Sequence, residues 1–322
     1  MIKIAINGFG RIGRAFFRKT IYCSDIEVKY INEPSNMDSI IHLLRYDSSI
    51  KVDSIDVLSK ENELICNGKR SMITNFSSPI ESEFDDIDIV IESSGRFLTN
   101  TCLEHYFKNN VRKVILSAPP MDNIPVFVMG VNANSYNGER IVSNASCTSN
   151  AISPILKEIK DKYHIMGGNI TTIHPFNNDQ TLLDSTRIND YRLSRNATLN
   201  IIPTQSSISD MIGRLFNEFS GKFIGDSIRV PTSIVSISNI DLLLDSKIEK
   251  EDILNIEFDS NIIGFDTDKR VSSDFIGDNR SGIIPVDLIK VNGSMCRIPV
   301  WFDNESGYVA RLIDMVRHIY AS

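Results

Sequence analysis

The chain has 322 residues, of which 42% are hydrophobic, and its formal net charge at pH 7 is −7. This length suffices for two domains with ordinary buried cores, and the acidic balance argues against nucleic acid as the main partner. No apolar run approaches the roughly 20 residues that a membrane-spanning helix needs. The N-terminal residues run directly into a strand and then glycines, unlike a signal peptide. We therefore expect a cytoplasmic protein that binds neither membranes nor nucleic acid.

The cysteines are odd in number and scattered, without CxxC spacing. An odd number of scattered cysteines argues against a disulfide framework and against a zinc site, and it suits a reducing compartment. We expect no metal in this protein. The five positions are Cys23, Cys66, Cys102, Cys147 and Cys296.

Short apolar segments alternate with amphipathic ones up to about residue 146. This alternation predicts an α/β domain of the Rossmann type, a parallel sheet with helices on both faces. The expected strands are Ile2–Ile6, Val28–Ile31, Ile87–Glu92, Lys113–Ser117 and Val126–Gly130. The expected helices run from the first glycines to about Tyr22, over Met37–Leu44 and over Thr99–Asn109. An amphipathic helix at about 305–322 completes this domain, which is expected to bind NAD and to comprise residues 1–146.

The pattern changes at Cys147, where longer segments rich in Ile, Val, Thr and Ser begin. They predict an α+β catalytic domain over 147–304 with a mixed, largely antiparallel sheet. The long polar segment Asp179–Leu199 is expected to be a loop that is functional or covers a partner subunit. The expected strands are Gly168–His174, Phe223–Val230, Ser233–Leu244 and Lys290–Phe302, and the expected helices are Ser207–Phe219 and Lys250–Phe258.

A glycine-rich turn follows the first predicted strand and opens a helix. The motif Gly8-Phe9-Gly10-Arg11-Ile12-Gly13 has the GxGxxG spacing of dinucleotide-binding proteins. The first glycine allows the tight turn, the second lets the backbone approach a pyrophosphate, and the third packs helix against strand. The helix N-terminus attracts the anion. The alternative is a turn with a structural role only.

Glu33 stands 20 residues beyond Gly13, at the end of the second predicted strand. A carboxylate there hydrogen-bonds the adenine ribose hydroxyls and repels a 2′-phosphate. We therefore expect NAD rather than NADP as the cofactor. The alternative is an ordinary solvated loop acid.

Cys147 stands where small polar residues give way to a helical pattern, in Ser143-Asn144-Ala145-Ser146-Cys147-Thr148. At a helix N-terminus the sulfur faces unpaired backbone N–H groups and the positive end of the helix dipole, and both favour the thiolate. Pro154 is expected in the first turn of this helix, where proline is tolerated. We expect Cys147 to be a nucleophile, and a buried packing cysteine is the alternative.

A nucleophilic cysteine needs a base and a group that holds developing charge. His174 ends a predicted strand before a polar loop, and it is the best placed of the five histidines to take the thiol proton. Arg229 lies near the end of another predicted strand and suits an anion bound in bidentate fashion. The alternatives are a structural histidine and a structural ion pair.

These motifs and several others resemble the glyceraldehyde-3-phosphate dehydrogenase family, in the family's order and over essentially the whole chain. The segments that carry the resemblance are Asn7–Arg14, Tyr46–Ser48, Ser143–Thr148, Thr171–His174, Asn200–Pro203, Arg229–Thr232 and Trp301–Tyr308. The resemblance implies an NAD-dependent, phosphorylating dehydrogenase of glyceraldehyde 3-phosphate that acts in glycolysis or gluconeogenesis. It also implies a homotetramer in which residues 179–199 pack near a neighbouring subunit's cofactor.

In such an enzyme the sulfur of Cys147 attacks the aldehyde, and His174 takes the hydroxyl proton while a hydride passes to the nicotinamide. Inorganic phosphate then cleaves the thioester to an acyl phosphate, and the Cys147 backbone N–H and His174 stabilise the oxyanion. By motif position, Asn304 holds the nicotinamide carboxamide. The resemblance assigns the cofactor to Gly8, Gly10, Arg11, Ile12, Gly13, Glu33, Ser93, Ser94, Gly95, Ser117, Asn304 and Tyr308, inorganic phosphate to Ser146, Thr148 and Ser206, and the substrate phosphate to Arg229.

The chain departs from the family pattern after His174, where two threonines usually help to bind the substrate phosphate. Their places hold Asn177, which can donate a hydrogen bond, and Asp179, which cannot when ionised. A like charge beside a phosphate is unfavourable unless Arg229 or a cation intervenes. An aspartate here also resembles erythrose-4-phosphate dehydrogenases, which oxidise a longer sugar phosphate and use water on the thioester. That activity, a different small aldehyde, and a catalytically silent binding protein of the same fold are the alternatives.

Overall fold

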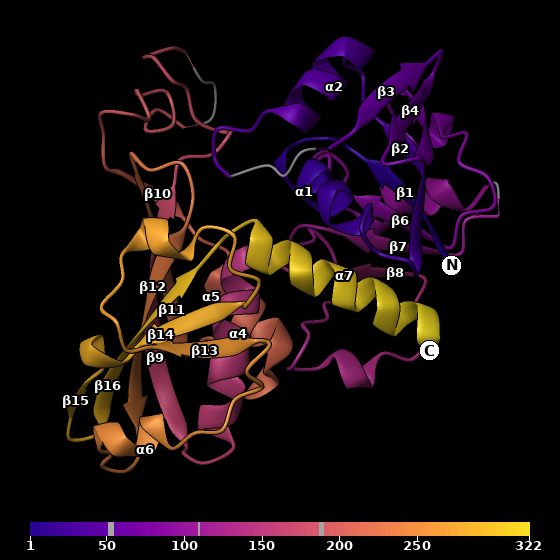
Figure 1. Ribbon diagram of the computed structural model, residues 1–322. Helices are drawn as coiled ribbons and strands as arrows, with labels where there is room; N and C mark the ends of the chain where they lie inside the picture. The colour runs from indigo at the N-terminus through magenta and orange to yellow at the C-terminus, as the bar shows by residue number, and fades with distance from the viewer. Residues whose placement is uncertain (51–54, 109, 187–189) are drawn as a thin grey trace. The chain divides into compact units, whose positions relative to one another are not determined.

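The computed structural model describes residues 1–50, 55–108, 110–186 and 190–322. The chain divides into two compact units, one formed by Met1–Ser146 with Val309–Ser322 and the other by Cys147–Tyr308. Each unit is built on a sheet of its own, and the elements are labelled in Figure 1.

The first unit contains an eight-stranded sheet in the order β3-β4-β5-β2-β1-β6-β7-β8. All neighbours from β5 to β8 run parallel, whereas β3, β4 and β5 form an antiparallel meander. Parallel neighbours need crossover connections, which is why strands and helices alternate along this part of the chain. The strands are β1 (Ile2–Asn7), β2 (Ile26–Asn32), β3 (Val57–Lys60), β4 (Glu63–Cys66), β5 (Lys69–Thr74), β6 (Ile89–Glu92), β7 (Lys113–Leu116) and β8 (Ile141–Ser143).

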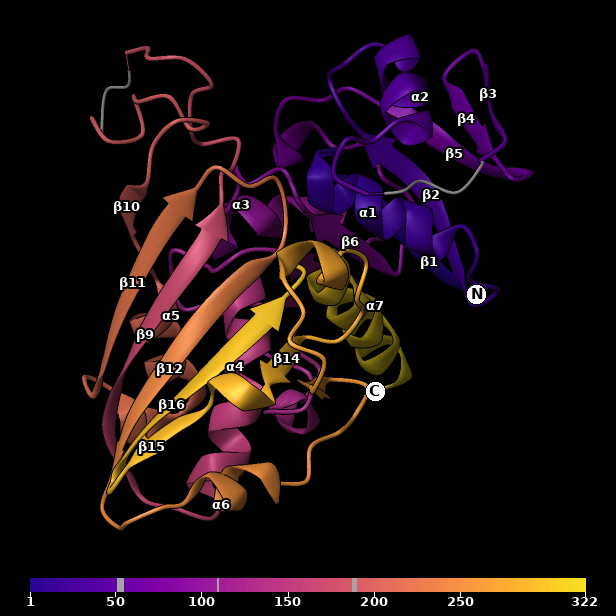
Figure 2. The ribbon, with the colours of Figure 1, turned by 60° about the vertical axis from the view of Figure 1, so that its left-hand side comes forward.

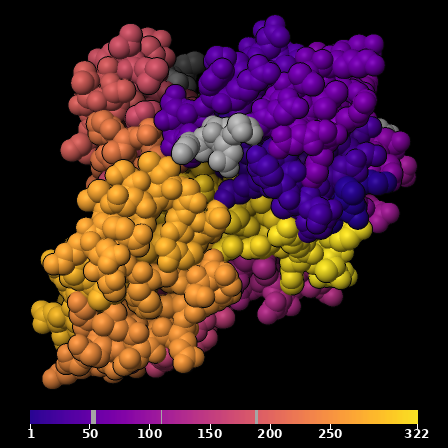
Figure 3. Space-filling model, in the orientation of Figure 1, coloured from indigo at the N-terminus to yellow at the C-terminus, as the bar shows by residue number. Residues whose placement is uncertain are grey.

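Both faces of this sheet are buried, so its central strands are almost continuously apolar. Ile4 and Ile91 point into a core that includes residues of α1, α2 and α7, whereas Ala5 and Val90 belong to a second core around Tyr106. The yellow C-terminal residues of α7 reach the surface in Figure 3. The helices are α1 (Arg11–Thr20), α2 (Met37–Arg45), α3 (Asn100–Leu103) and α7 (Ser306–Ala321).

The second unit contains a mixed sheet in the order β10-β11-β9-β12-β16-β14-β13, with β15 paired to β16. Figure 2 shows β10, β11, β9, β12 and β16 side by side. Among the described strand pairs of this second sheet, β9 with β11 and β13 with β14 are parallel and the others are antiparallel. The two sheets confirm the expected fold class. The strands are β9 (Ile165–Pro175), β10 (Ile202–Gln205), β11 (Phe223–Val230), β12 (Ser236–Leu244), β13 (Ile263–Asp266), β14 (Gly282–Pro285), β15 (Lys290–Asn292) and β16 (Met295–Phe302).

Helix α4 (Cys147–Lys160) packs against the sheet of the second unit, on β9, β12, β14 and β16. The packing is tight, because a Cβ added to Gly282 of β14 would lie 3.0 Å from the carbonyl oxygen of Ala151. Pro154 was expected in the first turn but lies deeper inside the helix, where it cannot donate the usual backbone hydrogen bond. Helices α5 (Ile208–Leu215) and α6 (Lys250–Leu254) complete this unit.

Several of the predicted elements were wrong in extent, including the helices expected over 207–219 and 250–258, which are the shorter α5 and α6. The segment 126–130 was expected to be a strand, but in the structure it contributes only an isolated bridge, between Val126 and Ser143. The edge of the sheet on this side is β8. The strand expected over 290–302 is two strands, β15 and β16, because Gly293 turns the chain at φ +63°. The helix expected over 99–109 is the short α3 followed by a 3₁₀ turn at Glu104–Lys108, and residue 109 lies outside the described residues.

Within the described part of the chain, no helix has both the length and the apolar character to cross a membrane. In the same residues, no three His, Cys, Asp or Glu side chains gather where they could hold a metal ion. All five cysteines are free thiols.

Candidate active site

Cys147 is the first residue of α4, and the chain reaches it through a sharp turn. The preceding Ala145 is fully buried and has φ +54°, a left-handed conformation that side chains other than glycine rarely adopt. The first N–H groups of a helix have no intrahelical partner. Here the backbone N–H groups of Cys147 and Thr148 and the Thr148 hydroxyl hydrogen-bond the sulfur. The turn therefore surrounds one thiol with hydrogen-bond donors.

His174 lies within reach of this sulfur. It is near the end of β9, its side chain is buried, and its Nε2 is 3.8 Å from the Sγ of Cys147. Contacts between a nucleophile and its base are often this long before substrate binds. Because β9 lies inside the sheet between β11 and β12, the imidazole is held by a rigid element. The pair can exchange a proton.

The position of Cys147 at the start of a helix is one of several influences on the pKa of its thiol. Burial raises the pKa of the Cys147 thiol above its ordinary value, and this effect outweighs the hydrogen bonds from Thr148 and the nearby charge of Arg229, which both lower it. Burial removes water from around the sulfur, and the loss of solvation disfavours the charged thiolate relative to the neutral thiol. A base beside the sulfur, such as His174, favours loss of the thiol proton.

Arg229 lies on β11 directly opposite His174 of β9 in the parallel register. Its guanidinium is largely buried, and its Nη1 lies 2.7 Å from the His174 Nδ1 and 3.3 Å from the carbonyl oxygen of Pro175. Its Nε is buried and has no hydrogen-bond partner among the described residues. This guanidinium thus keeps unused donors beside the Cys147–His174 pair, which suits an anionic ligand.

The two residues that stand in the places of the family's threonines lie in the loop after β9. The Asp179 carboxylate points towards Arg229, with Oδ2 3.8 Å from Nη2, and its side chain is half exposed. Asn177 accepts a backbone hydrogen bond from Gln180 at 3.0 Å and donates its own N–H to the Gln180 side chain. The Nε2 of Gln180 is buried without a partner among the described residues. Sequence reasoning did not single out Gln180.

The expected long loop over 179–199 contains one isolated bridge, between Thr181 and Asn196, and no helix or strand in its described residues. Residues 187–189 of this prediction lie outside the described residues.

The residues assigned to inorganic phosphate lie at two helix starts. Thr148 follows Cys147 in α4, and Ser206 precedes α5, where its Oγ accepts a hydrogen bond from the Ile208 N–H at 3.3 Å. Both side chains are half-buried, as is Ser146 at the end of the first unit. Hydroxyls at helix N-termini are suited to hold an anion.

A cavity of about 290 Å³ opens in the first unit at the carboxyl ends of β1, β2 and β6. This size is at the lower end of the range of small-molecule sites, roughly 300 Å³ upward. The crevice at the carboxyl ends of parallel strands is where doubly wound sheets bind nucleotides. Its lining residues are Asn7, Gly8, Gly10, Asn32, Glu33, Pro34, Asn75, Phe76, Ser77, Ser93, Ser94, Arg96 and Phe97.

The three glycines of the turn differ in the space around them. Gly8 has φ +92°, and a Cβ there would lie 2.5 Å from the Ser94 backbone. A Cβ on Gly13 would lie 2.2 Å from the Gly8 carbonyl oxygen, so this glycine packs α1 against the turn. Gly10 has open space around its Cα. The turn therefore leaves room for a pyrophosphate at the start of α1, and the residues present fit NAD.

Glu33 lies at the end of β2 and closes this turn. Its Oε2 accepts a hydrogen bond from the Phe9 N–H at 3.0 Å, and its Oε1 accepts one from the Ser35 hydroxyl at 2.7 Å. The carboxylate is thereby held in the lining of the cavity.

Other residues assigned to the cofactor do not line this cavity. Arg11 and Ile12 lie in the first turn of α1, and Gly95 follows β6 with φ +70°. Ser117 donates two hydrogen bonds to the carbonyl oxygen of Glu92, both at 2.9 Å. Tyr308 is buried in the first turns of α7.

Asn304 lies in the second unit, close after β16. Its side chain is buried, and its Oδ1 accepts a hydrogen bond from the backbone N–H of Val235 at 3.0 Å. Val235 has φ +68°, which is an outlier for a β-branched residue. The amide group of Asn304 is therefore held in a single orientation by a strained turn.

Glu92 is a buried residue of the first unit. The sequence analysis predicted it only as the last residue of a strand. Its carboxylate accepts hydrogen bonds from Asn7 at 2.6 Å, from Tyr106 at 2.7 Å and from Ser94, and burial raises its pKa. It ties β1 and β6 together under the Gly8 turn. No local pattern reveals such a network, because its members come from distant parts of the chain.

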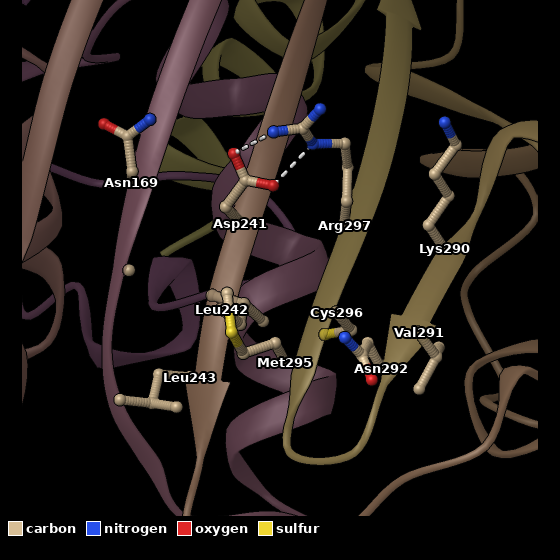
Figure 4. A pocket seen from close by; sticks show the side chains of 11 residues that line it. Asn169, Asp241, Leu242, Leu243, Lys290, Val291, Asn292, Met295, Cys296 and Arg297 are labelled. Carbon is tan, nitrogen blue, oxygen red and sulfur yellow. Dashed lines mark hydrogen bonds and ion pairs between the residues drawn. The ribbon is translucent and has the colours of Figure 1, made fainter.

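A second, larger cavity of about 370 Å³ lies on the sheet of the second unit, along β9, β12, β15 and β16 (Figure 4). Its lining is mostly apolar, and the Asp241–Arg297 ion pair runs along one side at 2.6 Å. Its one cysteine, Cys296, is buried with a pKa raised to about 11. Because a raised pKa disfavours the thiolate, Cys296 is not an activated nucleophile.

Comparison of the sequence with known proteins identifies the class of protein. Residues 2–100 match the family model of the glyceraldehyde 3-phosphate dehydrogenase NAD binding domain, and residues 146–304 match that of its C-terminal domain. Similar proteins include glyceraldehyde-3-phosphate dehydrogenase of Buchnera aphidicola, 36% identical over 98% of both chains, and glyceraldehyde-3-phosphate dehydrogenase A of Escherichia coli K12, 35% identical over 99% of both. The cytosolic glyceraldehyde-3-phosphate dehydrogenase of Leishmania mexicana is 34% identical over the whole of both chains.

The fold and these matches define an NAD-dependent oxidoreductase. The chain belongs to the glyceraldehyde-3-phosphate dehydrogenase family, which confirms the resemblance of its motifs.

Proposed function

We propose that this protein oxidises glyceraldehyde 3-phosphate with NAD and inorganic phosphate to 1,3-bisphosphoglycerate in glycolysis or gluconeogenesis. The observation that carries the proposal is the 3.8 Å distance between the Cys147 Sγ and the His174 Nε2, with the Arg229 guanidinium beside the same imidazole. A nucleophile, a base and an anion-binding cation are the groups that this reaction needs.

In the proposed reaction His174 takes the proton of the Cys147 thiol, the sulfur attacks the aldehyde carbon, and the imidazolium gives its proton to the aldehyde oxygen to form a hemithioacetal. The backbone N–H of Cys147 and the imidazole hold the developing oxyanion. His174 then takes the hydroxyl proton as the carbon loses its hydride, for which NAD is the acceptor when bound. Inorganic phosphate attacks the resulting thioester and expels the Cys147 thiolate, which releases the acyl phosphate, and the proton held by His174 returns to the sulfur.

The residues assigned to NAD would divide its binding between them. Gly8, Gly10 and the start of α1 would hold the pyrophosphate, and Glu33 the adenine ribose. Ser93 lines the same cavity. The proposal assigns further contacts with NAD to Arg11, Ile12, Gly13, Gly95, Ser117, Asn304 and Tyr308.

Arg229 would bind the phosphate of the substrate, with Asn177 as a second donor. Ser146, Thr148 and Ser206 would bind the inorganic phosphate. The buried Nε of Arg229 has no partner among the described residues. This supports an anion-binding role for Arg229, because a buried guanidinium donor without a partner is unfavourable unless a ligand satisfies it.

The test is NADH formation by the purified protein with glyceraldehyde 3-phosphate, with and without inorganic phosphate. We expect turnover that depends on phosphate, and a kcat/KM at least tenfold higher than for erythrose 4-phosphate. Phosphate-independent turnover with a preference for the four-carbon sugar would replace the proposal with an erythrose-4-phosphate dehydrogenase. Absence of turnover on any short sugar phosphate would reject the proposal and leave a binding protein.

We further propose a cytoplasmic homotetramer. The five free cysteines suit a reducing compartment, and the Leishmania relative bears the name of a cytosolic enzyme. Light scattering of the eluted protein measures the oligomeric state, and a mass of one or two chains would contradict the tetramer.

A further inference from the structure

A row of polar side chains crosses the carboxyl ends of four parallel strands in the first unit. Thr74, Asn32, Asn7 and Glu92 stand opposite one another in the registers of β5, β2, β1 and β6. Asn32 and Asn7 are buried, and Glu92 is fully buried. Neighbouring strands of a sheet lie about 4.8 Å apart, so each side chain of the row can hydrogen-bond the next.

The hydrogen bonds of this row run in one direction, towards Glu92. Asn32 donates from Nδ2 to the Oδ1 of Asn7 at 2.7 Å, and Asn7 donates from its own Nδ2 to the Oε2 of Glu92 at 2.6 Å. The Nδ2 of Asn32 also donates to the backbone carbonyl oxygen of Phe76 at 3.0 Å. Because a carbonyl oxygen can only accept, it fixes which end of the Asn32 amide faces it, and the orientation of the Asn7 amide follows.

The second oxygen of Glu92 holds the segment after β6. Oε1 accepts hydrogen bonds from the Ser94 backbone N–H at 2.9 Å and from the Ser94 hydroxyl at 2.5 Å. The Oγ of Ser94 in turn accepts one from the backbone N–H of Arg96 at 3.2 Å. We call this set of hydrogen bonds the relay. It joins Glu92 to five residues that line the cavity at the carboxyl ends of β1, β2 and β6, namely Phe76, Asn32, Asn7, Ser94 and Arg96.

Both oxygens of Glu92 face a group that can only donate in this arrangement, the Asn7 amide on one side and the Ser94 backbone N–H on the other. We propose that Glu92 is a positioning residue for the nucleotide. By accepting at both oxygens it fixes the orientation of the polar groups in the cavity wall. The inference rests on the proposed function, because it takes this cavity as the place where NAD binds.

A glutamine at position 92 cannot replace the carboxyl group, although its shape is nearly the same. Its amide presents an NH₂ group in place of one oxygen. Towards Ser94, that group would meet a backbone N–H, which cannot be reversed. Towards Asn7 it would meet another NH₂ group, and turning over both Asn7 and Asn32 would bring two oxygens together at Phe76. An unmatched buried polar group is unfavourable, so the segments that line the cavity would have to move.

Tyr106 offers a comparison, because it donates to the same carboxyl group from the core. Its hydroxyl is 2.7 Å from the Oε2 of Glu92, and its fully buried ring stacks on Phe84. Tyr106→Phe therefore removes one buried hydrogen bond of Glu92 without reversing any amide of the relay. It is the matched control for the loss of a hydrogen bond alone.

The experiment measures the Kd of ADP-ribose, which is NAD without its nicotinamide, by calorimetry on the intact protein. We expect Glu92→Gln to raise this Kd on the order of tenfold or more, because it leaves buried donors and acceptors unmatched beside the cavity. Tyr106→Phe should lower the thermal midpoint of unfolding but keep the Kd within about threefold of the wild type. An unchanged Kd in Glu92→Gln, or an equal loss in Tyr106→Phe, would overturn the inference.

Steady-state kinetics separates positioning of the nucleotide from general damage. In Glu92→Gln the KM for NAD should rise by about the factor found for ADP-ribose, whereas kcat at saturating NAD should stay within about twofold. A fall in kcat with an unchanged KM would contradict the inference. Because ADP-ribose binding needs no turnover, wild-type NADH formation together with tight ADP-ribose binding by Glu92→Gln would leave the proposed function standing and remove only this inference.

An exchange of the two facing groups should restore the relay. In the double variant Asn7→Asp with Glu92→Gln, the new amide accepts from Ser94 and donates to the new carboxyl group, which still accepts from Asn32. We expect the double variant to bind ADP-ribose at least about fivefold more tightly than Glu92→Gln, since groups in contact are not additive. Asn7→Asp alone should bind weakly, because two carboxyl groups then face each other.

The double variant also covers a failure of Glu92→Gln to fold. In that case recovery of both folding and ADP-ribose binding in the double variant is the expected result. A double variant that recovers neither, or that folds and binds no more tightly than the single variants, would overturn the inference.

Discussion

The sulfur of Cys147 and the Nε2 of His174 lie 3.8 Å apart although 27 residues separate them in the sequence. One begins a helix and the other stands near the end of a strand in the middle of a sheet. The contact exists because α4 packs across β9. It joins a thiol whose pKa is raised by burial to the group that can remove its proton.

Replacing the sulfur tests the covalent route. We expect Cys147→Ser to lower kcat by about 10³-fold or more, because a hydroxyl is a far weaker nucleophile than a thiolate. NAD affinity, measured by calorimetry, should stay within about twofold, since the cofactor cavity lies in the first unit. Cys102→Ser is the matched control and should keep full activity. Turnover of Cys147→Ser near the wild-type rate would contradict a thioester.

Glu33 should determine the choice between NAD and NADP. In Glu33→Gln the side chain keeps its shape but loses the charge that accepts from Phe9 and repels a 2′-phosphate. Hydrogen bonds to charged groups contribute about 1.5–3 kcal/mol, so we expect the KM for NAD to rise roughly tenfold or more. The preference for NAD over NADP should shrink by a similar factor. Glu63→Gln, at an exposed ion pair of the same unit, should change neither value.

Asp179 should weaken binding of the phosphorylated aldehyde by competing for Arg229. The carboxylate is 3.8 Å from the guanidinium and half exposed, and such pairs contribute about 0–1 kcal/mol. We therefore expect Asp179→Asn to lower the KM for glyceraldehyde 3-phosphate by up to about fivefold. The kinetics of unphosphorylated glyceraldehyde should not change.

The control for this variant is Asp184→Asn, which removes an exposed carboxylate paired with Arg195 in the same loop. It should leave both KM values as they are. An equal gain for the unphosphorylated aldehyde in Asp179→Asn would show that Asp179 does not compete with a phosphate.

Stability should fall in alkaline solution because of buried thiols. Burial raises the pKa of Cys66 to about 12 and that of Cys296 to about 11. Above pH 9 the unfolded thiols lose their protons while the folded ones keep them, so the unfolded state binds fewer protons and the free energy of unfolding falls as pH rises. Each thiol contributes at most about 1.4 kcal/mol per pH unit.

Urea unfolding of the wild type and of Cys66→Ala between pH 8 and 11 checks this expectation. Cys66→Ala should start less stable, because a buried side chain is truncated, but its stability should decline less steeply above pH 9. Parallel curves for the two proteins would show that the Cys66 thiol ionises as readily in the folded state as in the unfolded one.

The parts of the fold that sequence reasoning predicted are those with local causes. The glycine turn, β1 and α1 follow from a run of adjacent residues, and their geometry needs no distant partner. The alternation of strands and helices likewise predicted the parallel sheet. By contrast, β3, β4 and β5 were not predicted, and neither was β8, whose three residues are too few for a periodic pattern.

Sequence motifs alone indicated the family, the residue types of the candidate site and NAD as the cofactor, because spacing within a motif and the chemistry of its side chains are local properties. The effect of burial on the Cys147 thiol and the 2.7 Å approach of the Arg229 guanidinium to the Nδ1 of His174 became visible only in the three-dimensional structure. Solvation and the register between strands depend on which distant segments pack together, and no local stretch of residues contains that information.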